Sequence, residues 1–353
     1  MDSDNQTTTN GKNGYDLPKK VAILHSDVKR EYFPSEESYS AEKDAIHYAD
    51  VISSYIQKLG IETKLFPGNS SLIELLKEYK PDMVLNLVDT LKGSDYQASI
   101  IPAVLELLEI PYIGTDSLGL ALSSNKFLIS RLLESNGVPV AHSQLFRTPT
   151  DYLDPTLRYP LISKLNETHG SIELNKDAVS EDEKELRERL RYLITTYKQP
   201  TLVEEFIGGR EISAVLLEGL NKKVYLGERI FSNQDEKYQF VSFDIKWGSG
   251  TLNDTHYQKY EDPILREYVK KAFAVIGMYD YGRFDIRVDS SGRYIFIDSN
   301  PNPFLGPKEV DSSMGIIPDL YGVTFEETLN RLIINTIRDS QGKERLPYPQ
   351  STK

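Results

Sequence analysis

The sequence predicts an α/β protein, because strand-like and helix-like segments alternate through its first third. Val21–His25 and Met83–Val88 are short apolar runs typical of buried strands. Between them, apolar residues recur at steps of three and four over Ala45–Leu59, which predicts an amphipathic helix. A second helix is expected over Ile100–Leu108, followed by a strand at Tyr112–Gly114. This alternation favours a parallel sheet covered by helices on both faces.

Length and composition narrow the class of protein. The 353 residues are enough for two or three domains. A net charge of −12 without a basic stripe argues against a nucleic-acid partner. No apolar run approaches the roughly 18 residues of a membrane span, so no membrane partner is expected. The absence of cysteine excludes disulfides and thiolate metal sites.

The first 17 residues are polar and lack the apolar core of a signal peptide. We therefore expect a disordered tail over residues 1–17 and a cytoplasmic protein. The first folded domain is placed at residues 18–115.

A second region begins near residue 116. Ser123 or Ser124 is expected to cap a helix that ends at Gly137. Further along, the sequence predicts a strand at 160–164, a turn at Gly170–Ser171, a charged helix with a solvated face at 181–194, and strands at 201–206 and 211–217.

A hairpin near the C-terminal end carries the most informative residues. Two short strands are joined at Ser291–Gly292. If the turn is a two-residue loop, Asp285 faces Asp298 directly, and like charges in that position destabilise a sheet unless a cation lies between them. Asn300 emerges on the same face as Asp298. Two carboxylates and an amide oxygen suit Mg²⁺, and Arg283 on that face could meet a phosphate. The alternative is an exposed acidic hairpin.

Two lysines are candidates for binding phosphate. Lys126 lies in the first turn of its helix, where its charge opposes the helix dipole and a bound anion would offset that cost. Lys164 ends a strand before the polar loop 166–171, whose backbone N–H groups can hold phosphate oxygens. Each residue alone is equally consistent with an ordinary surface lysine.

Carboxylates and one long loop add weaker candidates. Glu204 and Glu205 end an apolar strand, and Glu211 follows a double glycine, so these carboxylates could accept hydrogen bonds from ribose hydroxyls or could simply be edge-strand charges. Lys246 lies beside Trp247, the only tryptophan, in a polar loop of about 20 residues that is long enough to suggest a cover over an active site.

The histidines give little evidence for a metal site or a catalytic site. No two of the five have metal-ligand spacing, and no catalytic triad is evident. His25, at the carboxyl end of the first strand, lies where open α/β sheets bind ligands.

Taken in order, these residues resemble the ATP-grasp ligases, and among them the D-alanine–D-alanine ligase group. The likeness covers most of residues 20–338, including the stretches Leu108–Val140 and LVEEFIGGREI. The resemblance implies a three-domain ATP-grasp fold with an N-terminal Rossmann-like (pre-ATP-grasp) domain. The central ATP-grasp domain would span residues 116–203, and the C-terminal ATP-grasp and metal-binding domain residues 204–345.

The resemblance also implies roles for individual residues, with ATP and Mg²⁺ as cofactors. Lys126, Lys164 and the loop with Gly170 and Ser171 would contact the nucleotide phosphates. Adenine would lie against Glu204 and the backbone of Glu205 and Ile207, and the ribose against Glu211. The catalytic residues would be Arg283, which stabilises the transferred phosphoryl group, and Lys246, in the loop that closes over the triphosphate. The metal ligands would be Asp285, Asp298 and Asn300.

The motifs by which D-alanine ligases hold their substrates are replaced. HSDVKREYFPSEESYS stands where the group has a glycine-rich, glutamate-containing motif, and NPNPFLGPKEVDSS follows the metal asparagine. Asp298 stands where the group commonly has Glu. This pattern most resembles ligases that join an amino acid to mycosporine-glycine. Lys308 would then meet the carboxylate of the acceptor, and His25 would lie near a substrate.

The resulting expectation is an ATP-dependent ligase that forms a C–N bond between an amino acid and a phosphate-activated small molecule. Two alternatives stay open. One is a D-alanine–D-alanine or other dipeptide ligase, and the other is a non-catalytic nucleotide-binding protein, which should have lost a metal ligand or a phosphate lysine. A homodimer is also an open option.

Overall fold

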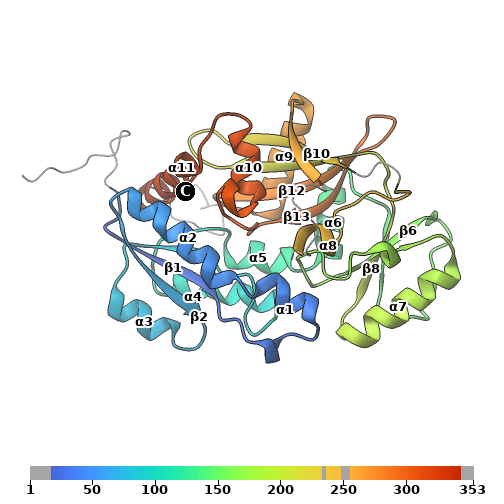
Figure 1. The fold of residues 1–353 in the computed structure, drawn as a ribbon, viewed down its shortest axis with the longest axis horizontal. Coiled ribbons are helices and arrows are strands. Elements are labelled where there is room, and N and C mark those ends of the chain that lie inside the picture. The colour runs from blue at the N-terminus through green and yellow to red at the C-terminus, as the bar shows by residue number, and fades with distance from the viewer. Residues whose placement is uncertain (1–16, 233–235, 248–254, 343–353) are drawn as a thin grey trace, which may run out of the picture.

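The computed structural model describes residues 17–232, 236–247 and 255–342 and contains three β-sheets (Figure 1). The predicted tail therefore lies, except for Leu17, outside the described residues. In Figure 1 the blue N-terminal layers and the green α7 region occupy opposite ends of the molecule, and the strands of the third sheet run between and above them.

The first sheet is parallel, as predicted, with the strand order β2-β1-β3-β4. Its strands are β1 (Lys20–Ser26), β2 (Glu62–Gly68), β3 (Met83–Leu87) and β4 (Tyr112–Ile113). The helices of this region are α1 (Glu36–Glu42), α2 (Ala45–Lys58), α3 (Leu72–Tyr79) and α4 (Ile100–Leu107), with short 3₁₀ helices at Arg30–Tyr32 and Tyr96–Ser99. The sequence reading identified neither β2 nor α3.

The second sheet is antiparallel, with the order β5-β8-β6-β7. It consists of β5 (Ser143–Phe146), β6 (Leu161–Leu165), β7 (Val179–Ser180) and β8 (Thr201–Glu205). Helix α7 (Glu183–Tyr197) packs on it through Leu186 and Leu190. Helices α5 (Ser117–Ser123) and α6 (Lys126–Ser135) precede this sheet, and a 3₁₀ helix spans Lys176–Ala178.

The third sheet is also antiparallel, with the order β11-β10-β9-β12-β13. It consists of β9 (Arg210–Leu217), β10 (Lys223–Phe231), β11 (Thr255–Tyr260), β12 (Tyr281–Val288) and β13 (Tyr294–Asn300). The helices are α8 (Phe243–Trp247), α9 (Pro263–Ile276), α10 (Ser313–Asp319) and α11 (Phe325–Gly342), with a 3₁₀ helix at Lys308–Val310.

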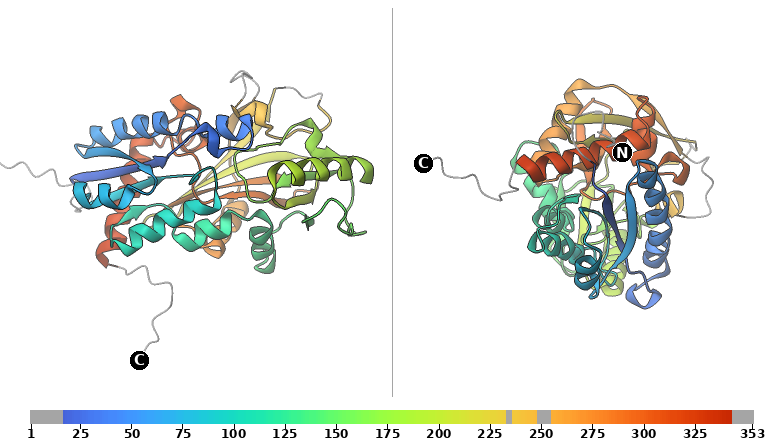
Figure 2. Two further views of the ribbon diagram at one scale, coloured as in Figure 1. Left: turned by 90° about the horizontal axis from the view of Figure 1, so that it is seen from below. Right: turned by 90° about the vertical axis from the view of Figure 1, so that its left-hand side faces the viewer.

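One hydrophobic core joins the two ends of the chain. Val21 and Ile52 of the N-terminal layers are buried in the same cluster as Val215 of β9 and Leu329 and Ile333 of α11. Both views of Figure 2 show the red helix α11 beside the N-terminal layers. Helix α9 covers the third sheet through a separate core. The shared core fixes the position of the N-terminal sheet relative to β9 and β12.

The N-terminal cap observed in the structure is the predicted one at helix α11 but not at helix α6. The predicted capping box of α11 is confirmed: Thr324 N donates to Glu327 Oε2 at 2.8 Å, and Glu327 N donates to Thr324 Oγ1 at 3.2 Å. The prediction that Ser123 or Ser124 caps α6 is wrong. Asn125 is the cap, because its side chain accepts from Leu128 N at 3.0 Å, and the serines end the preceding helix.

The hairpin of β12 and β13 has the predicted pairing of carboxylates, but its turn differs from the predicted one. Asp285 is paired with Asp298 as predicted. The turn is nevertheless not a two-residue loop, because Asp289 N donates to the carbonyl of Arg293 at 3.1 Å and three residues lie between them. A β-bulge just after Asp285 leaves Ile297 as an extra residue in β13. The bulge compensates for the longer turn and brings the two carboxylates opposite each other.

Candidate active site

Two adjoining cavities lie where the three sheets meet. The larger cavity, of about 580 Å³, lies between the second and third sheets. The smaller cavity, of about 370 Å³, extends toward α1 and the carboxyl end of β3. Their common wall is formed by Tyr48, Thr168, His169, Gly170, Ile172, Lys246, Trp247, Arg283, Asn300 and Phe304. Two ligands bound in these cavities would meet at that wall.

Most of the residues predicted from the sequence line the larger cavity. They are Lys126, Lys164, Gly170, Ser171, Glu204, Glu205, Ile207, Glu211, Lys246, Arg283, Asp285, Asp298 and Asn300. They come from segments as far apart as α6 and β13. The structure thus gathers into one place candidates that were individually weak.

Two predicted residues are not brought to either cavity. Lys308 lies in a 3₁₀ helix and its Nζ bonds Asp319 Oδ2 at 2.9 Å on the surface. His25 is buried, and its Nδ1 lies 2.9 Å from the carbonyl of Ser26. Successive side chains of a strand point to opposite faces. Ser26, the neighbour of His25 in β1, therefore points the other way, and its Oγ accepts from the backbone N–H groups of Asp89 and Thr90, two residues that line the smaller cavity.

The two lysines lie on different elements and converge. Lys126 is the first residue of α6, and its Nζ donates to the carbonyl of Thr168 at 2.6 Å. Lys164 on β6 forms a buried ion pair with Glu204 on β8, with Nζ and Oε2 2.6 Å apart. Its Nζ also donates to the carbonyl of the bulge residue Ile297 at 3.1 Å. Burial lowers the pKa of Lys126, against the attraction of Asp298.

The facing carboxylates are held by neighbouring groups. Asp285 accepts from Ser213 Oγ at 2.8 Å and from Arg283 Nη2 at 3.0 Å. Asn300 Nδ2 donates to Asp298 Oδ2 at 3.3 Å, so both lie on one face as predicted. Burial opposes ionisation of Asp298, but nearby cations, Lys126 foremost, lower its pKa to about 2. Asp298 is thus ionised at neutral pH, and Asp285 is paired with Arg283.

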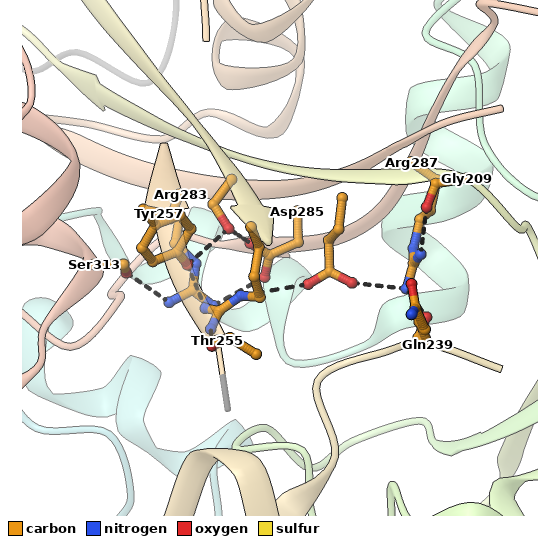
Figure 3. Close-up of polar contacts among 11 residues, drawn as sticks. Gly209, Gln239, Thr255, Tyr257, Arg283, Asp285, Arg287 and Ser313 are labelled. Atoms are coloured by element: carbon orange, nitrogen blue, oxygen red, sulfur yellow. Dashed lines mark hydrogen bonds and ion pairs between the residues drawn. The ribbon is translucent and has the colours of Figure 1, made fainter. Parts of the chain in front are cut away.

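Arg283 links these carboxylates to the shared wall. Its Nη1 donates to Ser313 Oγ at 3.2 Å, and Figure 3 shows it between Asp285 and Ser313. Its Nε has no protein partner among the described residues. No group of three or more His, Asp or Glu side chains able to hold a metal occurs in the described part of the chain. A metal here would be held by two carboxylates and the amide oxygen of Asn300, a set that fits Mg²⁺.

Glu211 is held by arginines that the sequence reading missed. Arg287 Nη2 lies 2.7 Å from Glu211 Oε2, and Arg229 Nε lies 3.7 Å from Oε1. Arg287 also donates to the carbonyl of Gly209 at 3.1 Å and to that of Gln239 at 2.5 Å (Figure 3). Arg287 lies between Ile286 and Val288 in β12, and a charge between two apolar residues was the available signal. Arg229 follows Glu228 in β10 and offered no such signal.

A short helix covers the shared wall. Helix α8 is anchored by Phe243 N, which donates to the carbonyl of Leu174 at 2.8 Å, and by Trp247 Nε1, which donates to the carbonyl of Gly170 at 2.7 Å. Lys246 on this helix opens onto both cavities. Desolvation and the adjacent Arg283 lower its pKa to about 8. Residues 248–254 of the predicted covering loop lie outside the described residues.

The smaller cavity is acidic, which the sequence reading also missed. Glu42, Asp89 and Asp95 line it. Desolvation and the charge of Asp95 raise the pKa of Asp89 to about 7, and burial raises that of Asp95 to about 6. The pKa of Glu42 is also raised, first by burial and then by the two aspartates. The signal was the position of Asp89, just after the carboxyl end of a parallel strand.

Comparison with known proteins places the chain in a family. The pattern described as D-ala D-ala ligase C-terminus matches residues 132–334, more than half of the chain. The chain belongs to this family. The expectation of an enzyme of this class, an ATP-dependent ligase that forms C–N bonds with ATP and Mg²⁺, is confirmed.

Relatives and solved structures agree with this assignment. The D-alanine–D-alanine ligase of Halorhodospira halophila is 26% identical over 302 residues, covering 85% of this chain and 93% of that protein. An uncharacterised protein of Sinorhizobium fredii is 28% identical over 270 residues, covering 73% and 78%. The D-alanine–D-alanine ligase of Bacillus anthracis, solved in complex with ATP, superposes with a TM-score of 0.70 at 18% identity, over 92% of this chain and 100% of that chain. The predicted ATP-grasp fold is thereby confirmed.

Among the described helices, none is long and apolar enough to cross a membrane.

Proposed function

We propose that this protein joins the amine of an amino acid to a phosphate-activated small-molecule acceptor, with mycosporine-glycine as the acceptor, and releases ADP and phosphate. The observation that carries the proposal is the wall shared by the two cavities, which contains Lys246, Arg283 and Asn300. ATP would occupy the larger cavity with its terminal phosphate at this wall. The acceptor would occupy the smaller cavity on the other side.

The larger cavity offers contacts along the length of a nucleotide. Lys126 and Lys164, with the turn at Gly170 and Ser171, would hold the phosphates. Both residues of that turn have positive φ. At the other end, Glu204 with the backbone of Glu205 and Ile207 would contact adenine, and Glu211 would accept from the ribose hydroxyls.

Asp285, Asp298 and Asn300 would hold Mg²⁺. The ion would neutralise charge on the β- and γ-phosphates when bound. The chain's own part is to keep the two carboxylates opposite each other, which the bulge at Ile297 achieves, and to keep Asp298 ionised.

The reaction would then need positioning and charge neutralisation at the wall. An oxygen of the acceptor attacks the γ-phosphorus, and the bond from that phosphorus to the oxygen of ADP breaks. Arg283 and Lys246 are the cations that can stabilise the transferred phosphoryl group. The amine of the amino acid next attacks the carbon that bears the phosphorylated oxygen. A C–N bond forms, the C–O bond breaks, phosphate leaves, and the attacking amine gives up a proton.

The choice of acceptor rests on the smaller cavity. Phe33, Tyr48, Tyr96 and Phe304 contribute aromatic surface to it, which suits a ring-shaped molecule better than the methyl group of alanine. The sequence segments at this cavity are also those in which the chain departs from the D-alanine ligase motifs. Because neither Lys308 nor His25 reaches the cavity, neither is part of the proposed site.

Two other functions compete with this proposal. A D-alanine–D-alanine or other dipeptide ligase is supported by the names of the curated relatives. A non-catalytic nucleotide-binding protein is disfavoured, because every predicted metal ligand and phosphate lysine lines the cavity. A homodimer stays a prediction.

The test is phosphate release from ATP and Mg²⁺ with a panel of amino acids, each with and without mycosporine-glycine. The proposal expects release that needs both an amino acid and mycosporine-glycine. Release with D-alanine alone would identify a dipeptide ligase instead, and no release with any pair would favour the non-catalytic alternative.

A further inference from the structure

One short segment at the shared wall is contacted by helices from the regions of all three sheets. Residues 170–174, the wall segment, include two residues that line both cavities, Gly170 and Ile172. Helix α8 donates hydrogen bonds to the carbonyls at both ends of the segment, from Trp247 and Phe243. Helices α7 and α1 contact the segment through a residue that lines neither cavity.

That residue is Glu173, which is buried and bound to α7. Its Oε1 accepts from the hydroxyls of Tyr192 and Tyr197, each at 2.7 Å. Its Oε2 lies 3.2 Å from Arg189 Nη1, and Arg189 Nη2 donates to the carbonyl of Glu173 at 2.5 Å. Because both charges of this pair are buried, loss of one partner would leave the other without compensation. The ion pair therefore holds the wall segment on α7.

The backbone of the wall segment has a conformation that needs such anchors. The φ angle is 83° at Gly170, 59° at Ser171 and 63° at Glu173. The left-handed region is unfavourable for the two of these residues that have a Cβ atom. Strained backbone persists where the surrounding structure holds it, and it is common at ligand sites. Here it presents Gly170 and Ser171 to the larger cavity, at the proposed position of the phosphates.

Glu173 also connects the wall segment to α1. Its N–H donates to Glu37 Oε2 at 3.0 Å, and within the described part of the chain this is the one hydrogen bond of the Glu37 carboxylate. Burial raises the pKa of Glu37, and the charges of Glu173 and Asp244 raise it further, whereas the bond from the Glu173 N–H favours the charged form. A carboxylate in so unfavourable a place indicates that the bond has a function.

Helix α1 in turn forms part of the smaller cavity. Three of its residues line that cavity: Ser38, Ala41 and Glu42. Neither Glu37 nor Glu173 lines either cavity. A second bond joins the N-terminal region to the residue before the wall segment, because His169 N donates to Asp95 Oδ2 at 2.7 Å. A displacement of the wall segment would therefore reach α1 and the lining of the smaller cavity.

We propose that Glu173 is a positioning residue that couples the two cavities, because it holds the phosphate-side turn in place and fixes α1 beside it. The inference rests on the proposed function, which places the nucleotide in the larger cavity and the acceptor in the smaller one.

The coupling follows from the ordering of one shared segment. A nucleotide whose phosphates bond to the turn at Gly170 and Ser171 stabilises the strained conformation, and the bond from Glu173 to Glu37 then orders α1. The acceptor that arrives next meets an ordered cavity and bears less of the ordering cost. By linkage, the acceptor increases the affinity for the nucleotide by the same factor.

The test is hydrogen exchange of the full chain, measured by mass spectrometry with and without ADP and Mg²⁺. The nucleotide should slow exchange about tenfold in residues 36–42, as well as in residues 204–211 at the proposed adenine contact. Glu37→Ala removes the acceptor of the Glu173 N–H, so it should abolish the slowing in residues 36–42 and keep that in residues 204–211. Glu37→Gln keeps an acceptor and should retain both effects.

Glu36→Ala is the matched control. Glu36 precedes Glu37 in α1, is exposed, pairs with Arg30 at 3.0 Å on the surface and lines neither cavity. This variant should behave as the unaltered protein does. Glu173→Gln removes the charge that pairs with Arg189 and should, like Glu37→Ala, lose the slowing in α1. If Glu173→Gln does not fold, the two Glu37 variants still decide the question.

Calorimetry measures the same coupling as an affinity. Mycosporine-glycine should bind about tenfold more tightly to the protein saturated with ADP and Mg²⁺ than to the free protein, and Glu37→Ala should bring this ratio close to one. If mycosporine-glycine binds neither form, the acceptor of the proposed function is wrong, and hydrogen exchange alone decides the inference.

Two results of the exchange experiment would overturn the inference. One is slowing in residues 204–211 without slowing in α1 of the unaltered protein, and the other is equal slowing of α1 in Glu37→Ala. Absence of slowing in residues 204–211 as well would count against the nucleotide site of the proposed function, and the inference would fall with it.

Discussion

Asp285 on β12 pairs directly with Asp298 on β13, although the turn between the strands is longer than a two-residue loop. A bulge at Ile297 restores the register, and the carbonyl of that residue accepts a hydrogen bond from Lys164. One local irregularity therefore both aligns the two carboxylates and fixes a lysine beside them. Like charges in this position are costly in a sheet, which points to function and not to stability.

Asp298→Asn should reduce turnover by about 100-fold while the protein stays folded. The amide keeps the shape of the side chain but removes a charge that Mg²⁺ would need. Turnover over a range of Mg²⁺ concentrations, with circular dichroism for the fold, measures both effects. Near-normal turnover at ordinary Mg²⁺ would show that Asp298 is not a metal ligand.

ATP with Mg²⁺ should raise the melting temperature without any second substrate. Binding to the folded state alone stabilises it by about 2.7 kcal/mol at a hundredfold excess over Kd. Lys126→Met and Lys164→Met should both shrink this shift. Lys308→Met is the control, because Lys308 lines neither cavity, and its shift should stay normal. If ATP raises the melting temperature of all three variants as much as that of the unaltered protein, Lys126 and Lys164 do not bind the phosphates.

Intrinsic fluorescence should change when ATP and Mg²⁺ bind. Trp247 is the only tryptophan, lines both cavities and donates to the carbonyl of Gly170, so a nucleotide at the wall alters its surroundings. In parallel, Lys246→Ala should lower kcat more than it weakens ATP binding, because its contact with the transferred group belongs to the transition state. Tryptophan fluorescence that does not change with ATP and Mg²⁺, together with normal turnover in Lys246→Ala, would show that α8 takes no part in nucleotide binding or catalysis.

Asp95 should make the free protein less stable as pH rises. Its pKa is about 6 in the folded state, above its ordinary value of 3.8, so the folded state binds the proton more tightly than the unfolded state. This contribution to stability is fully present below about pH 4 and is lost as pH rises through about 6. Asp95→Asn, which keeps an acceptor for His169 N, should therefore raise the melting temperature more at pH 8 than at pH 4. An equal change at both values would contradict the assigned pKa.

The sequence predicted most of the residues that line the larger cavity because their signals are local. Strand periodicity predicts that Asp298 and Asn300 share a face, and a lysine in the first turn of a helix is visible without knowing the fold. The capping box at Thr324 is equally local. The domain boundaries were read from composition and resemblance, and they stay predictions.

The acidic side of the smaller cavity could not be found in this way. Glu42 and Asp89 come from segments far apart in the chain, and only the packing of α1 beside the carboxyl end of β3 brings them together. Arg229 and Arg287 were missed for the same reason, since each makes sense only beside Glu211 in the folded sheet. Lys308 was predicted to contact the substrate, because it is a basic residue in the segment that follows the predicted metal ligands. In the structure its side chain instead pairs with Asp319 on the surface.

The central claim is that an oxygen of the acceptor is phosphorylated and then leaves as part of phosphate. The most direct measurement uses mycosporine-glycine labelled with ¹⁸O at the ring oxygen, together with unlabelled ATP, Mg²⁺ and the amino acid that supports turnover. Mass spectrometry of the released phosphate should find the label transferred from the ring to phosphate in step with product formation. Unlabelled phosphate, with the label still on the ring, would contradict the account.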